Sequence, residues 1–327
     1  MMFLSGVGDL LPYPCTVRIL EGSLFSEVQV MGNSNVLIVR LYNCTDDLGK
    51  SLEVTLISDL SNMYNTELFL RISTDIANNR TFHTDSNGFQ MMERTTSHVL
   101  PMAANYYPAT TMAFLQDEEA RLTIHLEHAH GVGSQNNGEL EVMLDRFLMQ
   151  DDGRGVAEAL KDEQITKTQL RIQLETDGYC AYGCTLRNPS DLTQRTNEDF
   201  NYPPFITFEQ VRSQFPLFDY KPLKSELPCN VHLVMLKPVT YNVNDPRIGM
   251  MFHRQVTDCA TRKANASCTE KNKSFTMTDI FENTFPDTYN ITGLNFVKSR
   301  RTVLSSDPIR VDPMTVTALV TSLSDSR

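Results

Sequence analysis

The sequence predicts an all-β fold in which antiparallel sheets pack face to face as sandwiches. Apolar and polar residues alternate with a period of two in many short segments, which is typical of strands that bury one face. No ten-residue segment of the sequence repeats apolar residues at the spacing of an amphipathic helix. Many strands without helices between them favour antiparallel sandwiches over a parallel α/β architecture.

In chain order, the alternation predicts strands at 51–58, 67–73, 121–127, 139–144 and 169–175. The segment "VMGNSNVLIV" predicts a hairpin that turns at Gly32–Asn35. One short helix is predicted in "TFEQVRSQFP", because Thr207 and Gln210 form a capping box and Pro216 ends it. Further strands are predicted within 230–240, 249–254 and 315–323.

Proline and polar residues become frequent between about residues 188 and 229, which indicates a crossing between domains. The strands after this segment form a smaller β unit. We therefore place one domain at 1–220 and a second at 221–327.

The composition excludes several classes of protein. The 327 residues carry a net charge of −11, from 29 basic and 40 acidic side chains, so nucleic acid is not expected as a partner. No apolar run approaches the roughly 20 residues that span a bilayer, so no membrane span is expected. The first residues show no basic segment followed by an apolar one, so no targeting segment is visible.

Two features nevertheless point to a lumenal protein. Five N-glycosylation sequons begin at Asn43, Asn79, Asn265, Asn272 and Asn290. Up to three disulfides with one leftover thiol could form among Cys15, Cys44, Cys180, Cys184, Cys229, Cys259 and Cys268. The alternative is seven unpaired, buried thiols.

No short motif in the sequence clearly indicates a metal site or a catalytic site. "DDGRG" lacks the alternating acids of a calcium loop, and its glycines favour a turn with positive φ. His128 and His130 share a face on a strand while His125 points away, and no further ligand stands at companion spacing. We therefore predict neither a metal site nor a catalytic residue in this chain.

Several longer segments resemble one family. They are, in order, "ELFLRISTDI", "FHTDSNGFQMMER", "LPMAANYYPATTMAFLQD", "RLTIHLEHAHGVGSQNNGELEVMLDRFLMQDDGRG" and "LKDEQIT". These segments look like the C-terminal half of glycoside hydrolase family 38 α-mannosidases, and more like the Golgi mannosidase II branch than the lysosomal one. The resemblance implies a large antiparallel β supersandwich followed by a smaller β-sandwich domain.

The resemblance also implies an activity for the full-length enzyme: zinc-dependent, retaining hydrolysis of α-mannosidic bonds in N-glycans, in the Golgi lumen. Family members carry the zinc ligands, the nucleophile and the acid on a preceding catalytic barrel. None of those motifs occurs in this chain, so we expect zinc in the complete enzyme and none bound by this region. The expected partners are N-glycan mannose and the N-terminal barrel.

Three residues of this chain are implied to reach the mannose pocket. They are Tyr107 and, as the weaker candidate, Tyr106 in "NYYP", and Arg254 in "HR". "DDGRG" is a structural loop in this interpretation, and the apolar stretch 103–115 is expected to be exposed where the barrel docks. The alternative function is a non-catalytic β-sandwich that binds glycans or proteins.

Overall fold

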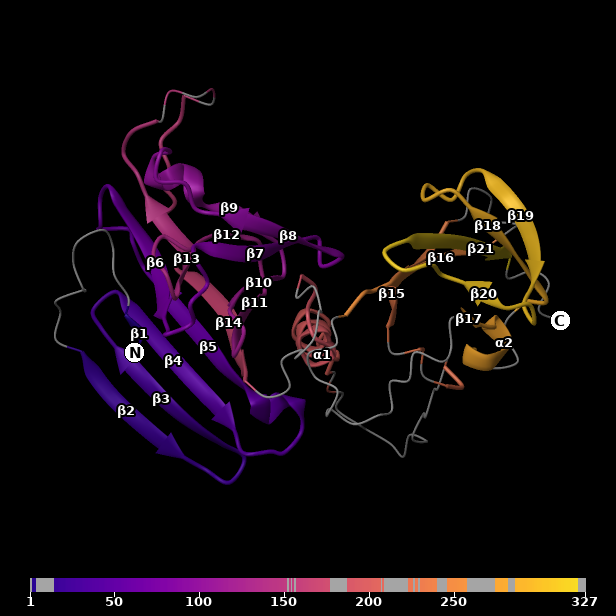
Figure 1. The fold of residues 1–327 in the computed structure, drawn as a ribbon, viewed down its shortest axis with the longest axis horizontal. Helices are drawn as coiled ribbons and strands as arrows, with labels where there is room; N and C mark the ends of the chain where they lie inside the picture. The colour runs from indigo at the N-terminus through magenta and orange to yellow at the C-terminus, as the bar shows by residue number, and fades with distance from the viewer. Residues whose placement is uncertain are drawn as a thin grey trace. The chain divides into compact units, whose positions relative to one another are not determined.

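A computed structural model gives the fold (Figure 1). It describes residues 2–3, 15–151, 153, 155, 157–176, 187–206, 208, 223–225, 227–228, 230–239, 246–257, 274–281 and 286–322. The described residues through Pro204 form one compact unit, and those from Phe205 onward form a second. The boundary predicted after residue 220 lies outside the described residues.

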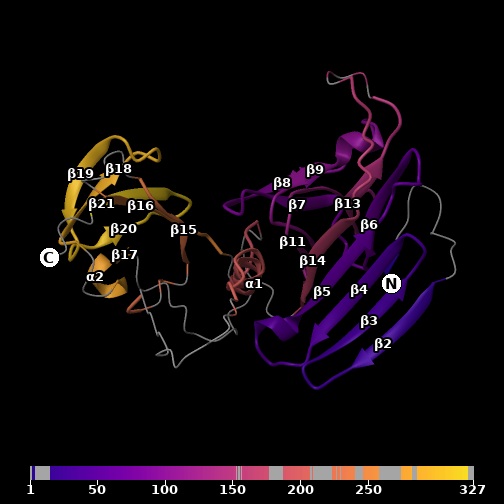
Figure 2. The ribbon, with the colours of Figure 1, turned by 180° about the vertical axis from the view of Figure 1, so that it is seen from behind.

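The first unit contains two antiparallel sheets (Figures 1 and 2). The nine-stranded sheet has the order β2 (Thr16–Glu21), β3 (Phe25–Met31), β4 (Asn35–Tyr42), β5 (Ser51–Ser58), β14 (Thr166–Glu175), β11 (Arg121–Leu126), β10 (Met112–Gln116), β7 (Thr81–Ser86) and β8 (Gln90–Thr95). The five-stranded sheet has the order β1 (Met2–Phe3), β6 (Thr66–Ser73), β13 (Glu139–Phe147), β12 (His130–Gly133) and β9 (Tyr107–Ala109).

Alternate residues of both sheets form one buried apolar cluster, which makes the unit a sandwich. Val54 and Leu56 of β5 join it from one sheet, and Leu70 of β6 and Val142 of β13 join it from the other. The period-two pattern therefore predicted these strands correctly, because every second side chain of a strand points to the same face. The predicted hairpin is also confirmed, since the Gly32 amide donates to the Asn35 carbonyl at 2.8 Å.

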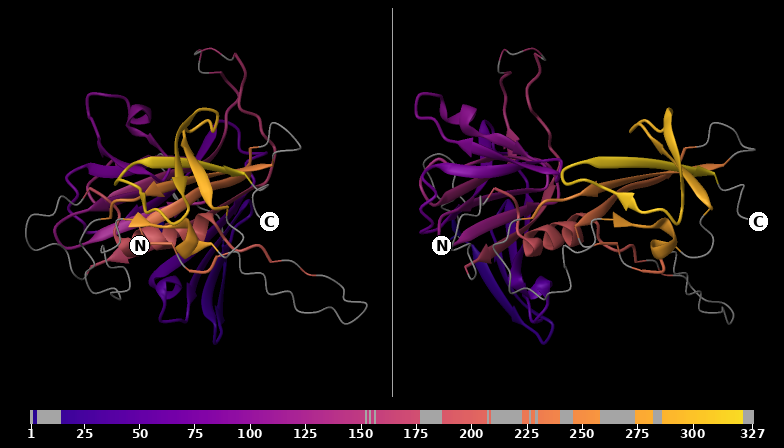
Figure 3. Two further views of the ribbon diagram at one scale, coloured as in Figure 1. Left: turned by 90° about the vertical axis from the view of Figure 1, so that its right-hand side faces the viewer. Right: turned by 45° about the vertical axis from the view of Figure 1, so that its right-hand side comes forward.

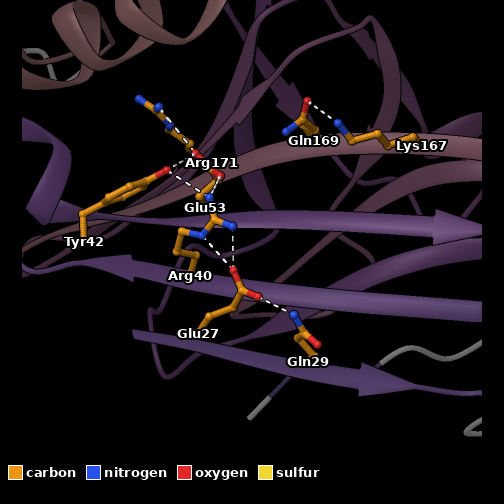
Figure 4. Close-up of polar contacts among 8 residues, drawn as sticks. All are labelled: Glu27, Gln29, Arg40, Tyr42, Glu53, Lys167, Gln169 and Arg171. Atoms are coloured by element: carbon orange, nitrogen blue, oxygen red, sulfur yellow. Dashed lines mark hydrogen bonds and ion pairs between the residues drawn. The ribbon is translucent and has the colours of Figure 1, made fainter. Parts of the chain in front are cut away.

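The opposite face of the nine-stranded sheet carries a ladder of charged side chains (Figure 4). Arg40 of β4 donates from Nε to Glu27 of β3 at 2.8 Å and lies 3.5 Å from Glu53 of β5. Arg171 of β14 lies 3.7 Å from the second oxygen of Glu53. Glu27 is only 5% exposed, so its pairing with Arg40 offsets the desolvation of its charge.

The longest described helix was missed by the sequence prediction. The helix α1 (Asp191–Asn201) begins after Ser190, whose hydroxyl accepts from the Thr193 amide at 3.0 Å. Its buried residues are mostly polar, including Thr193, Thr196 and Asn197. No apolar stripe marks such a helix in the sequence, so a periodicity search does not find it. The helix predicted at 207–216 falls almost wholly outside the described residues.

A hydrogen-bonded network replaces apolar packing between α1 and the nine-stranded sheet. The Glu175 carboxylate accepts from the hydroxyls of Ser190, at 2.5 Å, and Thr193, at 2.8 Å. His125 of β11 lies 3.1 Å from the Gln173 side-chain oxygen and 3.5 Å from that of Asn197. These buried groups are paired with one another, which limits the cost of removing them from water.

The second unit is also built from strands. Its five-stranded sheet has the order β15 (Val231–Pro238), β16 (Arg247–Arg254), β21 (Val316–Ser322), β18 (Thr288–Thr292) and β19 (Ser299–Leu304). A two-stranded sheet pairs β17 (Ser274–Phe275) with β20 (Ile309–Arg310), and α2 (Met277–Ile280) follows β17. Both sheets contribute to one buried cluster that includes Phe252, Phe275, Ile309 and Leu319. Figure 3 shows β16 in orange and β21 in yellow side by side.

Circular dichroism of the purified chain is expected to show a spectrum dominated by β structure. The reason is that residues in strands far outnumber residues in helices in the described part of both units. A helix content near one third, which is ordinary for globular proteins, would contradict this fold. The measurement needs only far-ultraviolet spectra of the folded chain, with its urea-unfolded form as the reference.

Candidate functional site

Tyr107 is the first residue of β9 and pairs with Val132 of β12. Because paired residues share a face of the sheet, its ring points toward the core of the sandwich with Val132. The ring meets Phe82 edge to face, with centroids 5.9 Å apart, and the Arg94 guanidinium lies 4.8 Å from its centre. Tyr107 is only half-buried, so these contacts fix the ring without enclosing the whole side chain.

Tyr106 lies on the other face of the same sheet. Its hydroxyl donates to the carboxylate of Glu141 on β13, and its ring lies 5.5 Å from that of Phe69 on β6. Burial, together with the adjacent Glu141 carboxylate, raises the pKa of the Tyr106 phenol. The two tyrosines of "NYYP" therefore stand in different environments, one over the core and one in a charged network.

Glu141 is the centre of that network and was not singled out from the sequence. It is 2% exposed, and Arg71 of β6 donates to it from Nε at 2.5 Å. Arg71 also lies 3.8 Å from Glu139, two residues earlier on β13. Arg71 and Glu141 are directly opposite in the β6–β13 register, which no local pattern reveals. The pair fixes the acceptor that holds the Tyr106 hydroxyl.

Two glycines of β12 make room for this arrangement. A Cβ atom added to Gly133 would lie 3.2 Å from Cδ1 of Tyr106, and one added to Gly131 would lie 3.0 Å from the sulfur of Met143. Both positions are tighter than ordinary carbon contacts. The "HGVGS" segment thus has a packing reason for its alternating glycines, because Met143 approaches β12 at Gly131 and Tyr106 approaches it at Gly133.

The chain after Tyr107 is held by a single carboxylate. Asp85, at the end of β7, accepts from three successive backbone amides, those of Thr110 at 2.7 Å, Thr111 at 2.9 Å and Met112 at 3.0 Å. It also accepts from the amide of Gly88 at 2.6 Å, within its own turn. The segments 83–85 ("HTD") and 108–112 ("PATTM") are therefore joined by these hydrogen bonds. Asp85 thus positions β9, the strand that begins with Tyr107.

Arg254 belongs to the second unit and ends β16. It is 7% exposed. When the Asn230 amide is oriented with its oxygen toward the guanidinium, that oxygen accepts from Nε at 3.0 Å and from Nη2 at 3.1 Å. Nη1 donates to the Val311 carbonyl at 3.4 Å. The guanidinium is thus oriented by its own unit, as a side chain that recognises a ligand requires.

The described residues of "DDGRG", which are Asp151, Gly153 and Gly155, fit the predicted turn. The Asp151 carboxylate accepts from the Gly153 amide at 2.9 Å, and Gly153 and Gly155 have φ of 72° and 139°. Glycine adopts such positive φ angles at the least steric cost, which explains both glycines. Asp152 and Arg154 lie outside the described residues.

The three histidines considered as metal ligands are divided between the sheets. His125 is buried in β11, whereas His130 begins β12 and His128 is exposed between the two strands. His130 bonds from Nδ1 to the Met143 carbonyl at 2.8 Å. In the described part of the chain, no three His, Cys, Asp or Glu side chains gather as a metal site would require.

The described sequons differ in exposure. Asn43 and Asn79 are exposed, and Asn79 lies in a turn with φ of 49°. Asn290 lies within β18, where its side-chain oxygen accepts from the hydroxyls of Ser299 and Thr302. Glycosylation therefore fits Asn79 best, because the Asn43 side-chain nitrogen donates to the Gly22 carbonyl at 2.8 Å and Asn290 is half-buried. The sequons at Asn265 and Asn272 lie outside the described residues.

Two cysteines fall within the described residues. Cys15 and Cys44 are exposed and unbridged, and they flank opposite ends of the β2–β4 meander. The other five cysteines lie outside these residues. The described helices include none that is long and apolar enough to cross a membrane.

Solved structures share this fold. Two Enterococcus faecalis proteins, a glycosyl hydrolase family 38 member and an α-mannosidase, align with 95% and 94% of the chain at TM-scores of 0.53 and 0.56. The chain covers 36% and 35% of these structures, at 11% and 10% identity, so they support the fold alone. Residues 14–154 match the Glycosyl hydrolases family 38 C-terminal domain. The fold and the match at residues 14–154 together define the class of protein: the chain contains a C-terminal domain of glycosyl hydrolases.

Sequence relatives extend the match beyond that domain. The chain is 34% identical over 315 residues to α-mannosidase 2x of Mus musculus, which covers 93% of the chain. It is 36% identical over 266 residues to α-mannosidase 2 of Homo sapiens, which covers 77% of the chain. The chain belongs to glycosyl hydrolase family 38. It spans about a quarter of the length of these relatives, 27% and 23%.

Proposed function

We propose that this chain is the C-terminal portion of a zinc-dependent retaining α-mannosidase that trims mannose from N-glycans in the Golgi lumen. The observation that carries the proposal is the similarity to mammalian α-mannosidases 2 and 2x over most of the chain. A retaining mechanism needs two carboxylates about 5 Å apart, one as nucleophile and one as acid. We assign both, with the zinc ligands, to the catalytic barrel that precedes this region in the family.

The assignment of the zinc ligands to that barrel comes from the family resemblance. Tetrahedral zinc sites use three or four histidine, cysteine or carboxylate ligands at one point. To this chain we assign the rim of the sugar pocket, through Tyr107, Tyr106 and Arg254.

Tyr107 is the best candidate for contact with a mannose hydroxyl. Its ring is fixed by Phe82 and Arg94, so little conformational entropy is lost when the phenol binds a sugar. The Tyr106 hydroxyl is already engaged by Glu141 and is the weaker candidate. Arg254 is likewise a weaker candidate than Tyr107, because it is 7% exposed and its guanidinium already donates to Asn230 and Val311.

Replacing Tyr107 with phenylalanine in the enzyme that includes the barrel is expected to lower kcat/KM by about tenfold, the equivalent of one hydrogen bond. Thermal stability is expected to stay within about 0.5 kcal/mol, because the ring contacts remain. Tyr106→Phe is the matched control: it is expected to cost about 1 kcal/mol of stability through the lost Glu141 bond, with a smaller effect on activity. Unchanged kcat/KM in Tyr107→Phe would contradict the assignment.

The chain on its own provides a second test. It is expected not to hydrolyse an aryl α-mannoside, since the nucleophile, acid and zinc ligands are assigned to the barrel. Turnover that survives repurification and disappears on zinc chelation would contradict that assignment.

A further inference from the structure

Tyr107 lies at the side of the first unit where both sheets end. Its strand β9 is the last strand of the five-stranded sheet, and β8 is the last strand of the nine-stranded sheet. Arg94 of β8 is directly opposite Phe82 of β7 in the register, so both side chains share one face of that sheet. Phe82 belongs to the buried apolar cluster, which makes this the inner face. Because both side chains also contact the Tyr107 ring, Arg94 links the two sheets at this side.

Most of the stretch 103–115 is not the exposed apolar surface that we expected. Ala109 and the four residues 112–115 are at most 1% exposed. The prediction was wrong because it treated an apolar stretch as exposed, whereas β10 lies inside the nine-stranded sheet. Tyr107 remains half-buried and Pro108 exposed. Tyr107 therefore lies where the stretch enters the interior, and its contacts with Phe82 and Arg94 fix it there.

The Arg94 guanidinium has no acidic partner in the described part of the chain. Arg94 is half-buried, and its Nε donates to the hydroxyl of Thr84, a fully buried residue, at 3.1 Å. The neighbouring acid, Glu93, points to the opposite face of the strand and lies 3.8 Å from Arg187. The principal partner of the charge is thus the ring of Tyr107, whose centre lies 4.8 Å from the guanidinium carbon.

Other partly buried arginines of the first unit differ from Arg94, because they are paired with carboxylates. They are Arg40 with Glu27 at 2.7 Å, Arg71 with Glu141, and Arg171 with Glu53 at 3.7 Å. A carboxylate beside a guanidinium cancels much of the electric field of that guanidinium at any third group. The ring of Tyr107 therefore experiences the charge of Arg94 without a described counter-charge beside it.

The stacked charge has two consequences for the phenol of Tyr107. The face of an aromatic ring is electron-rich, so a guanidinium stacked on it holds the ring in one orientation. The same charge draws electron density from the ring and its oxygen, which makes the O–H a stronger hydrogen-bond donor. Only arginine combines both effects with an anchor at Thr84, because the anchoring atom is Nε and lysine has no nitrogen at that point of its side chain.

We propose that Arg94 is the positioning residue of the sugar site: it orients the phenol of Tyr107 and directs its O–H, as a donor, to a hydroxyl oxygen of the bound mannose. The inference rests on the proposed function for the sugar and for the role of Tyr107. Arg94 acts on the sugar through the Tyr107 ring and does not touch the sugar itself. The loss of Arg94 therefore affects hydrolysis only when the Tyr107 hydroxyl is present.

A double-mutant cycle in the enzyme that includes the barrel tests this coupling. Arg94→Met keeps the packing of the apolar stem and removes the charge. It is expected to lower kcat/KM about fivefold in the wild-type background and less than about twofold in the Tyr107→Phe background. In the wild-type background, the effect of Arg94→Met is expected to divide between kcat and KM as the effect of Tyr107→Phe does. A general loss of stability would not reproduce that division.

Two further variants control the cycle. Arg94→Lys keeps a charge but loses the Nε anchor, so its kcat/KM is expected to lie between those of the wild type and Arg94→Met. Arg301→Met removes an exposed arginine from β19 of the second unit and is expected to leave kcat/KM unchanged. If Arg94→Met does not fold, Arg94→Lys takes its place in the cycle, and its effect is likewise expected to disappear in the Tyr107→Phe background.

Two outcomes would overturn the inference, and they differ in what they say about the proposed function. Equal losses from Arg94→Met in both backgrounds, with Tyr107→Phe itself impaired, would mean that Arg94 contacts the sugar directly or only stabilises the fold. The proposed role of Tyr107 would then stand, and the coupling alone would be wrong. Unchanged kcat/KM in Tyr107→Phe would remove the role of Tyr107 and, with it, that of Arg94.

Discussion

Replacing Asp85 with alanine is expected to destabilise the first unit by about 3–5 kcal/mol. The carboxylate is 3% exposed and accepts from four backbone amides, three of them consecutive at Thr110–Met112. Hydrogen bonds to a charged group contribute roughly 1.5–3 kcal/mol each, and their loss leaves buried donors without an acceptor. The contributions of the four hydrogen bonds do not add in full, because the backbone at Thr110–Met112 can relax toward water once the carboxylate is removed.

Urea unfolding monitored by circular dichroism measures the effect. Asp85→Asn is expected to give an intermediate loss, since it keeps the shape and one acceptor oxygen. Asp151→Ala is the control, because that exposed carboxylate accepts from a turn amide at Gly153 and its loss is expected to cost less than about 1 kcal/mol. Equal losses for Asp85→Ala and Asp151→Ala would show that the three-amide contact does not stabilise the fold.

Acidification from pH 6.5 to pH 4 is expected to destabilise the first unit through two buried histidines. Burial lowers the pKa of His83, near Arg121 and Arg187, to about 4. Burial also lowers the pKa of His125 to about 4, despite its hydrogen bonds to Gln173 and Asn197. In the unfolded chain both have a pKa near 6.5, so the unfolded state binds more protons between pH 4 and 6.5. The stabilisation is therefore complete above pH 6.5 and is lost as the pH falls toward 4.

The expected loss is up to about 3 kcal/mol for each histidine. His83→Phe separates the two contributions. The His83 ring stacks on Phe114 at 4.6 Å and neither of its nitrogens has a hydrogen-bond partner, so phenylalanine retains the contact and removes the titration. Free energies of unfolding measured at pH 4.5, 5.5, 6.5 and 7.5 are expected to fall about half as steeply in this variant. A slope equal to that of the wild type would contradict the assignment to His83.

The candidate site was only partly accessible to sequence reasoning. "NYYP" pointed to both tyrosines, but nothing local indicated which side chains Tyr106 and Tyr107 would each meet. Glu141 and Arg71 are 70 positions apart in the chain and meet only through the β6–β13 register. The alternating glycines of β12 are visible in the sequence, yet their reason lies in side chains of other segments, Met143 beside Gly131 and Tyr106 beside Gly133. Arg254 lies in the second unit, where Asn230 orients it.

The sequence by itself determined the all-β class and the positions of the strands with clear alternation, such as β5, β11 and β14, because alternation is a local property that each of these strands carries in its own residues. It also determined the "DDGRG" turn, since positive φ favours glycine wherever it occurs. Tertiary structure alone decided the rest. The helix α1 buries hydroxyl and amide groups that only the partners on β11 and β14 can satisfy. Whether an apolar face becomes core or stays exposed depends on which strands cover it. Ile19 and Val54 therefore have the same pattern in the sequence and opposite exposure in the fold.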